Sequence, residues 1–279
     1  MATSKYVVGV GMIIVALVAF AAGIFGAPLI NPQKTTTSAD PIWDSIVASG
    51  KIRIGTDPTW PPFELLDNSS NIVGFEVDLA DAIAANLNLT TEWHAVGFDT
   101  IITSVQSKDL DMGVSGFSVT AARLQQVEFT MPHSNTRAQV IMLQSVKNQY
   151  NITTLSSLSD LKTLGLTVGT QSGTTEQDEL NAAGVTSRAF NDYGAAISDM
   201  ASVSPTVQCV YAETPITTSW IAQYQAQGKT VLVVYDKPYY PCAFVVNKDA
   251  HTFVDKVNGA LAELINLGQV DVLRAKWHA

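Results

Sequence analysis

The sequence predicts an α/β fold in which two lobes, each a mostly parallel sheet flanked by helices, face one another. Strand-like and helix-like segments alternate from Pro41 onward, which is typical of βα units and parallel sheets. The alternation occurs in two sets, before and after about Val140. The chain has 279 residues, which is enough for one large or two ordinary domains.

Apolar periodicity and turn residues place the elements of both sets. The first set is expected to contain strands over 51–56, 91–96 and 111–115 and helices over 75–87, 98–106 and 121–127. The second is expected to contain strands over 167–170, 187–190, 207–211 and 231–235 and helices over 158–161, 175–183, 193–203 and 215–227. A C-terminal helix is expected over 252–267.

Two β-rich runs, 138–145 and 243–247, are interpreted as the crossovers that join the lobes. The chain would build lobe one over 42–138, lobe two over 139–240, and then complete lobe one over 241–279. Strands that end at a shared edge leave a cleft where small ligands bind.

The first residues resemble a targeting segment. Lys5 precedes an uncharged run whose core, Val7–Phe25, has about the 20 residues that a bilayer span requires. Residues 1–30 are therefore expected to be a signal peptide or a transmembrane anchor, and 31–41 a flexible tether. The whole chain carries a net charge of −9, and an acidic body argues against a nucleic-acid partner.

Arg123 follows a run of small and hydroxyl residues that includes Gly116 and Ser118. Small residues allow a ligand to approach the backbone closely, and a guanidinium can bind a carboxylate through two parallel hydrogen bonds. The alternative is a helix-start arginine that pairs with a surface acid.

Asp57 comes just after the first predicted strand, on a loop that three prolines stiffen. Trp60 on the same loop could lie flat against a ligand, and Phe98 at a helix start could face it. The alternatives are a capping aspartate, a half-buried tryptophan and a core phenylalanine.

Two residues of the second lobe follow the same pattern. Thr175 begins a helix whose free N–H groups suit an anion, and Glu213 ends a strand where its carboxylate could accept hydrogen bonds from an ammonium. Both are also ordinary helix-start residues. Together with Arg123 and Asp57 they supply what a zwitterionic amino acid requires, because an unpaired charge in a closed cleft is costly.

An ordered series of motifs resembles the extracellular solute-binding proteins of family 3, the amino-acid-binding components of polar amino acid ABC importers. The series includes Gly55-Thr-Asp57, Pro62-Phe63-Glu64, Gly74-Phe-Glu-Val-Asp78-Leu79, Ser118-Val-Thr120…Arg123 and Val168-Gly-Thr-Gln-Ser-Gly173-Thr-Thr-Glu176. The resemblance implies a type II periplasmic-binding-protein fold with two crossover hinges. It also implies extracytoplasmic binding of a free amino acid by hinge closure, and delivery to a membrane permease and its ATPase. No cofactor, metal or catalytic residue is expected, and the protein is expected to be a monomer.

The resemblance implies a role for each site residue. Arg123 would bind the ligand α-carboxylate, with backbone N–H groups at Ser118 and Thr175. Glu213 would bind the ammonium where the family has an aspartate, one methylene shorter, and the carbonyl of Gly116 would assist.

The same resemblance assigns the ligand side chain. Trp60 and Phe98 would sandwich it, and Asp57 would meet its polar or cationic end. Arginine, lysine or glutamine would suit such a site.

Three further questions stay open at the sequence level. The domain could instead be a sensory or adaptor ectodomain, or an enzyme similar to cyclohexadienyl dehydratases in which Glu213 acts as general acid. Cys209 and Cys242 could form a disulfide in an oxidising compartment or remain two buried thiols.

Overall fold

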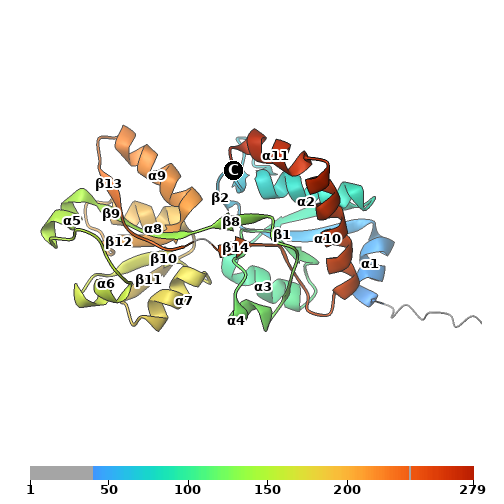
Figure 1. The fold of residues 1–279 in the computed structure, drawn as a ribbon, viewed down its shortest axis with the longest axis horizontal. Coiled ribbons are helices and arrows are strands. Elements are labelled where there is room, and N and C mark those ends of the chain that lie inside the picture. The colour runs from blue at the N-terminus through green and yellow to red at the C-terminus, as the bar shows by residue number, and fades with distance from the viewer. Residues whose placement is uncertain (1–39, 239) are drawn as a thin grey trace, which may run out of the picture. The chain divides into compact units, whose positions relative to one another are not determined.

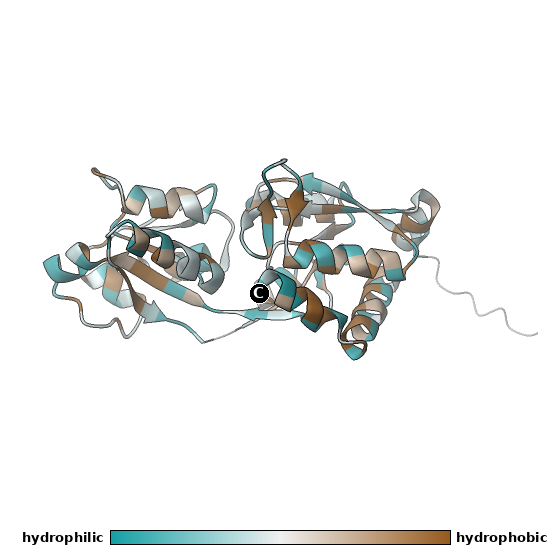
Figure 2. Ribbon diagram, turned by 90° about the horizontal axis from the view of Figure 1, so that it is seen from above, coloured by the Kyte–Doolittle hydropathy of each residue, from teal (hydrophilic) through white to brown (hydrophobic). Residues whose placement is uncertain are grey.

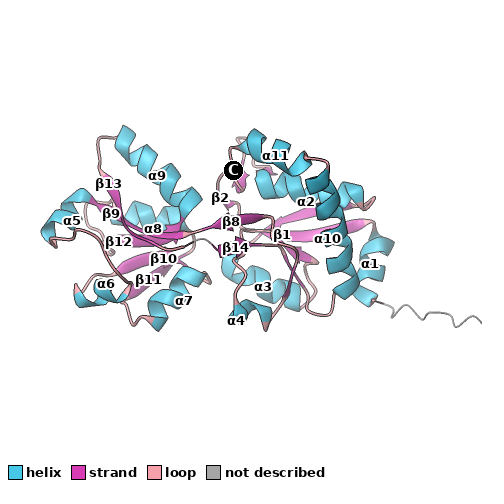
Figure 3. Ribbon diagram, viewed as in Figure 1, coloured by secondary structure: helices cyan, strands magenta, loops and turns pink. Residues whose placement is uncertain are grey.

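The computed structural model describes residues 40–238 and 240–279, which belong to one compact unit. This part of the chain contains two five-stranded sheets, and we call the portions built on them lobe 1 and lobe 2 (Figures 1 and 3). Hydrophobic residues concentrate on the strands of both sheets (Figure 2). The predicted signal peptide or anchor lies outside the described residues, and none of the helices described is both long and apolar enough to cross a membrane.

The sheet of lobe 1 has the strand order β5-β1-β6-β15-β7. β1 pairs in parallel with β5 and β6, whereas β15 runs antiparallel between β6 and β7. Helices α2, α10 and α11 lie on one side of this sheet and α3 and α4 on the other (Figure 1). The elements of lobe 1 are α1 (Pro41–Ser49), β1 (Lys51–Thr56), α2 (Phe75–Asn86), β5 (Thr90–Ala95), α3 (Phe98–Gln106), β6 (Met112–Gly113), α4 (Ala121–Leu124), β7 (Glu128–Phe129), β15 (Val245–Val246), α10 (His251–Asn266) and α11 (Gln269–Trp277).

The sheet of lobe 2 has the order β11-β10-β12-β9-β13. β10 pairs in parallel with β11 and β12, and β9 runs antiparallel between β12 and β13. Helices α8 and α9 cover one face, and α6 and α7 cover the other (Figure 1). The elements of lobe 2 are β9 (Ala138–Leu143), α5 (Gln144–Gln149), α6 (Ser159–Thr163), β10 (Val168–Gln171), α7 (Thr175–Ala182), β11 (Ser187–Phe190), α8 (Tyr193–Met200), β12 (Cys209–Glu213), α9 (Thr214–Ala226) and β13 (Val231–Asp236).

The prediction that 138–145 and 243–247 are the crossovers is wrong. The crossovers are the neighbouring strands β8 (Ser134–Thr136) and β14 (Tyr240–Cys242), which pair antiparallel with each other. The apolar runs beside them are strands β9 and β15, which are buried inside the two sheets. Apolar β-branched runs stabilise the fold most when both of their faces are covered, so they join the sheets rather than bridge the lobes.

A small antiparallel sheet replaces the loop predicted after the first strand. It consists of β2 (Thr59–Trp60), β3 (Glu64–Leu66) and β4 (Ile72–Val73). Trp60 pairs with Glu64 in this sheet, so its position is fixed by strand pairing as well as by the neighbouring prolines.

The two cysteines are free and buried. Cys209 lies in the sheet of lobe 2 and Cys242 in a crossover strand. Burial raises the pKa of the Cys209 thiol to about 12. Of the two alternatives left open by the sequence, the structure has the pair of thiols.

Candidate functional site: a closed cleft between the lobes

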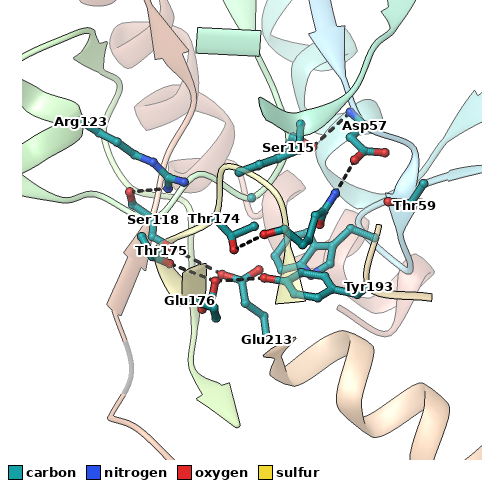
Figure 4. A pocket seen from close by; sticks show the side chains of 14 residues that line it. Asp57, Thr59, Ser115, Ser118, Arg123, Thr174, Thr175, Glu176, Tyr193 and Glu213 are labelled. Carbon is teal, nitrogen blue, oxygen red and sulfur yellow. Dashed lines mark hydrogen bonds between the residues drawn. The ribbon is translucent and has the colours of Figure 1, made fainter. Parts of the chain in front are cut away.

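A small pocket between the two lobes, called the cavity below, is lined by 14 residues (Figure 4). All eight residues singled out from the sequence are among them: Asp57, Trp60, Phe98, Gly116, Ser118, Arg123, Thr175 and Glu213. The first six come from lobe 1 and the last two from lobe 2. The structure therefore brings the whole predicted set to one place.

Arg123 lies at the interface between the two lobes. The hydroxyl of Thr120 caps α4 by accepting from the backbone N–H of Arg123 at 3.2 Å. The guanidinium donates from Nη1 to the Ser118 carbonyl at 3.1 Å and from Nη2 to the Gly173 carbonyl at 3.2 Å. Its central carbon lies 5.5 Å from the ring centre of Phe98 and 5.4 Å from that of Phe117, within the range of cation–π attraction.

Asp57 also contacts the opposite lobe. Its Oδ2 accepts from Nε2 of Gln171 at 2.6 Å, and its backbone N–H donates to Oγ of Ser115 at 3.2 Å (Figure 4). Burial raises the pKa of the Asp57 carboxyl, although hydrogen bonds from Thr59 and Gln171 favour the ionised form. A cation entering the cavity would favour the ionised form of Asp57.

Glu213 stands at the end of β12 and is 7% exposed. Oγ of Ser118, from the other lobe, donates to Oε1 of Glu213 at 3.4 Å. Burial raises the pKa of the Glu213 carboxyl well above its usual range, the nearby Glu176 carboxylate raises it further, and Arg123 opposes both. These surroundings therefore shift Glu213 toward its neutral form.

Glu176 is a site residue that sequence reasoning missed. Its carboxylate accepts from the hydroxyls of Tyr193 at 2.9 Å, Tyr240 at 2.6 Å and Thr175 at 3.1 Å. It lies in the first turn of α7, where acidic residues are common for reasons of helix stability alone, so the sequence carried no separate signal for it.

Five other lining residues were also missed: Thr59, Ser115, Gln171, Thr174 and Tyr193. Gln171 ends strand β10, and the rule that identified Glu213 at the end of β12 would have found it. The others line the cavity through loop geometry and helix orientation.

Trp60 and Gly116 form the floor of the cavity together. Gly116 has φ = +59°, and a Cβ added to it would lie 2.4 Å from the Trp60 ring. Trp60 also packs on Phe63, with ring centres 4.4 Å apart. Phe98, its expected partner, lines the cavity but stacks on Phe117 at 4.8 Å.

A cluster of buried titratable side chains contacts Gly116 on the side away from the cavity. Oε2 of Glu76 accepts from the backbone N–H of Gly116 at 3.0 Å, and Oε1 of Glu76 lies 2.8 Å from Nε2 of His133. Burial and the neighbouring Glu76 raise the pKa of Glu64 well above its usual range. Within residues 40–238 and 240–279, no group of three or more histidine, cysteine or acidic side chains is arranged to hold a metal ion.

Two α/β lobes joined by a pair of crossover strands, with a charged cavity between them, define a type II periplasmic-binding-protein fold. The chain belongs to the bacterial extracellular solute-binding proteins, family 3, whose model matches residues 52–279.

The relatives include several binding proteins. ABC transporter arginine-binding protein 1 of Escherichia coli is 27% identical over 234 residues, which cover 82% of this chain and 91% of that protein. The structure of an ancestral arginine-binding protein bound to glutamine has a TM-score of 0.71 and 30% identity, covering 82% of this chain and 97% of that one. An ancestral amino acid-binding protein, a precursor of cyclohexadienyl dehydratase, has a TM-score of 0.70 and 25% identity, covering 84% and 98%.

Proposed function

We propose that the chain binds one free amino acid, with arginine the leading candidate, and delivers it to an ABC importer. The observation that carries this proposal is the meeting of Arg123 and Glu213, from opposite lobes, in one closed cavity. An amino acid carries one charge of each sign, and a buried site must pair both of them.

The contacts of the site residues indicate how the ligand would lie. Arg123 donates two hydrogen bonds to backbone carbonyls at the interface between the lobes. A guanidinium has five N–H donors, so donors remain for a ligand carboxylate. Glu213 becomes the partner of the ammonium. Asp57 takes the far end of the ligand side chain.

The charge balance of the cavity favours a cationic side chain. Three carboxyl groups, those of Asp57, Glu176 and Glu213, line it together with one guanidinium. A ligand with two positive charges offsets this excess better than a neutral amino acid does. The family relatives that bind arginine support the same choice.

Delivery follows from closure. The ligand contacts one lobe in an open form, and the second lobe then swings over it. Closure is favoured only by the amount that ligand contacts stabilise the closed form over the open one. An extracytoplasmic location, with the closed surface docking on a permease that is driven by its ATPase, accords with the family and with a relative named as an ABC transporter component.

A thermal-shift screen of the twenty amino acids tests the proposal. Arginine should raise the melting temperature most, with lysine or glutamine next, because a ligand that binds only the folded form stabilises it by RT ln(1 + [L]/Kd). Agmatine, which lacks the carboxylate, should give little shift. Stabilisation by acidic or aliphatic amino acids alone would contradict the assignment of Asp57.

An enzyme is the second candidate, because Glu213 in its neutral form is a proton donor inside the cavity and one relative is a dehydratase precursor. Incubation with prephenate and with arogenate discriminates between the two. We expect neither compound to be converted, and product formation that Glu213→Gln abolishes would favour the enzyme.

A further inference from the structure

Two carboxyl groups share one wall of the cavity. Glu176, in the first turn of α7, and Glu213, at the end of β12, both belong to lobe 2, and Figure 4 shows their side chains next to each other. Both are almost fully buried in the closed form. Because they share a lobe, they remain neighbours whether the cleft is open or closed.

The two carboxyl groups differ in what holds them. Glu176 accepts three hydroxyl hydrogen bonds, all from lobe 2 and the crossover strand β14. Glu213 receives one long hydrogen bond, from Ser118, and that donor belongs to lobe 1. The Glu176 carboxyl group thus has three hydrogen-bond donors, whereas Glu213 is left with one long hydrogen bond once the cleft closes.

The other charges around Glu213 do not replace the missing partner. From lobe 1, Arg123 is attractive, while Glu64 and Glu76 are repulsive when ionised. From lobe 2 and the crossover, the groups that interact with Glu213 are Glu176, Tyr193, Tyr240 and Cys242. Arg123 already donates to two carbonyls, and Glu76 is paired with His133.

We propose that Glu176 makes closure of the cleft conditional on a positive charge at Glu213, supplied by the ligand ammonium or, in the empty protein, by a proton taken from solvent. The ammonium half of this inference rests on the proposed function, and the proton half does not. Closing the cleft without a ligand removes water from both carboxyl groups, which disfavours two negative charges side by side. The ligand then releases that proton to solvent as it binds.

The sign of the pH dependence follows. A carboxyl group that holds its proton more tightly in the closed form favours closure as the pH falls. The empty protein should therefore close at acidic pH and open as the pH rises. With bound arginine the cleft should stay closed over the whole range.

Energy transfer between two dyes measures closure directly. Val47→Cys in α1 and Val203→Cys in the loop after α8 give exposed labelling positions on the two lobes, whereas the native cysteines are buried. We expect the ligand-free full chain to approach its arginine-saturated transfer value as the pH falls from about 8 to 5. Saturating arginine should abolish this dependence.

Four substitutions identify the groups responsible. Glu176→Gln keeps an oxygen for the tyrosine hydroxyls but removes the charge, so the empty protein should be more closed at neutral pH and its pH curve flatter. Glu213→Gln, which resembles the neutral carboxyl group, should remove the pH dependence. Asp178→Asn, the same charge change at an exposed position of α7, should leave the wild-type curve. Asp57→Asn should flatten the curve less than Glu213→Gln does, because burial raises the pKa of Asp57 too but hydrogen bonds from Thr59 and Gln171 oppose that rise.

The outcomes separate this inference from the proposed function. A ligand-free curve that is flat from pH 8 to 5, while arginine still closes the cleft, overturns the inference and leaves the function standing. A pH-dependent curve that only Asp57→Asn flattens, or that Asp178→Asn alters as much as Glu176→Gln does, also overturns it. If the ligand-free protein closes as the pH falls, Glu176→Gln flattens that curve, and arginine does not bind, the inference is supported and the proposed ligand is refuted.

Calorimetry gives an independent count of the protons. Titration with arginine near pH 6, in buffers of different ionisation enthalpy, should show net proton release by the wild-type protein and less by Glu176→Gln. Equal release by both proteins contradicts the role given to Glu176.

Discussion

Arg123 combines a charge with an unusual degree of restraint. Two aromatic rings and two backbone carbonyls hold the guanidinium, so little side-chain freedom remains to be lost when a carboxylate binds. A lysine could not reproduce this arrangement, because its ammonium lacks the planar fork.

Replacing Arg123 should therefore remove most of the binding. Charge-assisted hydrogen bonds contribute about 1.5–3 kcal/mol each, so Arg123→Ala should weaken arginine binding about 100-fold or more. Isothermal titration calorimetry measures the change. Lys51→Ala, which removes an exposed cation of lobe 1, should leave the affinity unchanged, and a loss below about tenfold in Arg123→Ala would contradict the carboxylate role.

Position 116 accommodates glycine but no residue with a side chain. Its φ of +59° disfavours a Cβ, and the Trp60 ring occupies the space that the Cβ would need. Gly116→Ala should introduce about 1–3 kcal/mol of backbone strain and so lower the melting temperature. It should also weaken ligand binding, because the Trp60 ring must shift. Gly259→Ala in α10 is the matched control: its Cβ meets nothing within 4 Å, so stability should hold or rise slightly.

At the scale of elements, closure places two loops in close contact. Gly173, before α7, approaches the start of α3 so closely that an added Cβ would lie 2.7 Å from Cβ of Asp99. The two residues belong to opposite lobes, so this contact exists only in the closed form. The glycine thus permits closure, in addition to allowing the left-handed backbone of this turn.

A pair of glycines with the same backbone angle separates these effects. Gly173 and Gly228 both have φ = +76°, but a Cβ on Gly228 meets nothing within 4 Å. Gly173→Ala and Gly228→Ala should therefore lower the melting temperature similarly. Only Gly173→Ala should also weaken arginine affinity, by about tenfold or more. Equal affinities in the two variants would show that the contact between Gly173 and Asp99 accommodates a methyl group.

The first helix depends on one capping side chain. Asp40 accepts from the backbone N–H groups of Ile42 at 3.0 Å and Trp43 at 3.2 Å, and also from that of Thr252 in α10 at 2.8 Å. It therefore fixes α1 both to its own start and to the C-terminal part of lobe 1. Partial burial raises the pKa of Asp40, but these hydrogen bonds outweigh it and the net pKa is lowered.

Asp40→Ala should lower the free energy of unfolding by about 1 kcal/mol at neutral pH. Because the pKa is lower in the folded state, the contribution is fully present above the unfolded value near 4 and is lost as the pH falls through the folded value. Urea unfolding at several pH values should show the difference shrinking below about pH 4. Asp44→Ala, which removes an exposed carboxylate from α1, should show a smaller difference from wild type at neutral pH.

Elements with a long periodic pattern could be predicted from the sequence. α2, α3 and α10 lie within one residue of the predicted ranges because a buried face repeats along each of them. The two-residue strands β2 and β4 could not be predicted this way, because two residues are too few to show a periodic pattern. The crossovers were misplaced for the same reason.

Site residues could be predicted from the sequence where they stand at strand ends, and were missed elsewhere. Asp57 and Glu213 could be found because each stands just beyond, or at, the end of a parallel-sheet strand. Glu176 and Tyr193 became visible only when two helices and a crossover strand met around one carboxylate. Such a network is a property of the folded chain.

At the scale of the whole molecule, hydrogen bonds between described residues join the two lobes across the cavity. They join Asp57 to Gln171, Arg123 to Gly173, and Ser118 to Glu213. Each involves a residue that lines the cavity or directly precedes a lining residue, so the groups that close the cleft are those that a ligand would engage. Ligand binding and closure are therefore coupled.

The interleaved path of the chain also sets an order of assembly. β15 (Val245–Val246), which follows all of lobe 2 in the sequence, lies between β6 and β7, so the sheet of lobe 1 stays incomplete until these residues have been synthesised. The strands of lobe 2 come from one uninterrupted stretch, from β9 to β13. Although lobe 1 begins first, lobe 2 is the half that a nascent chain can finish first.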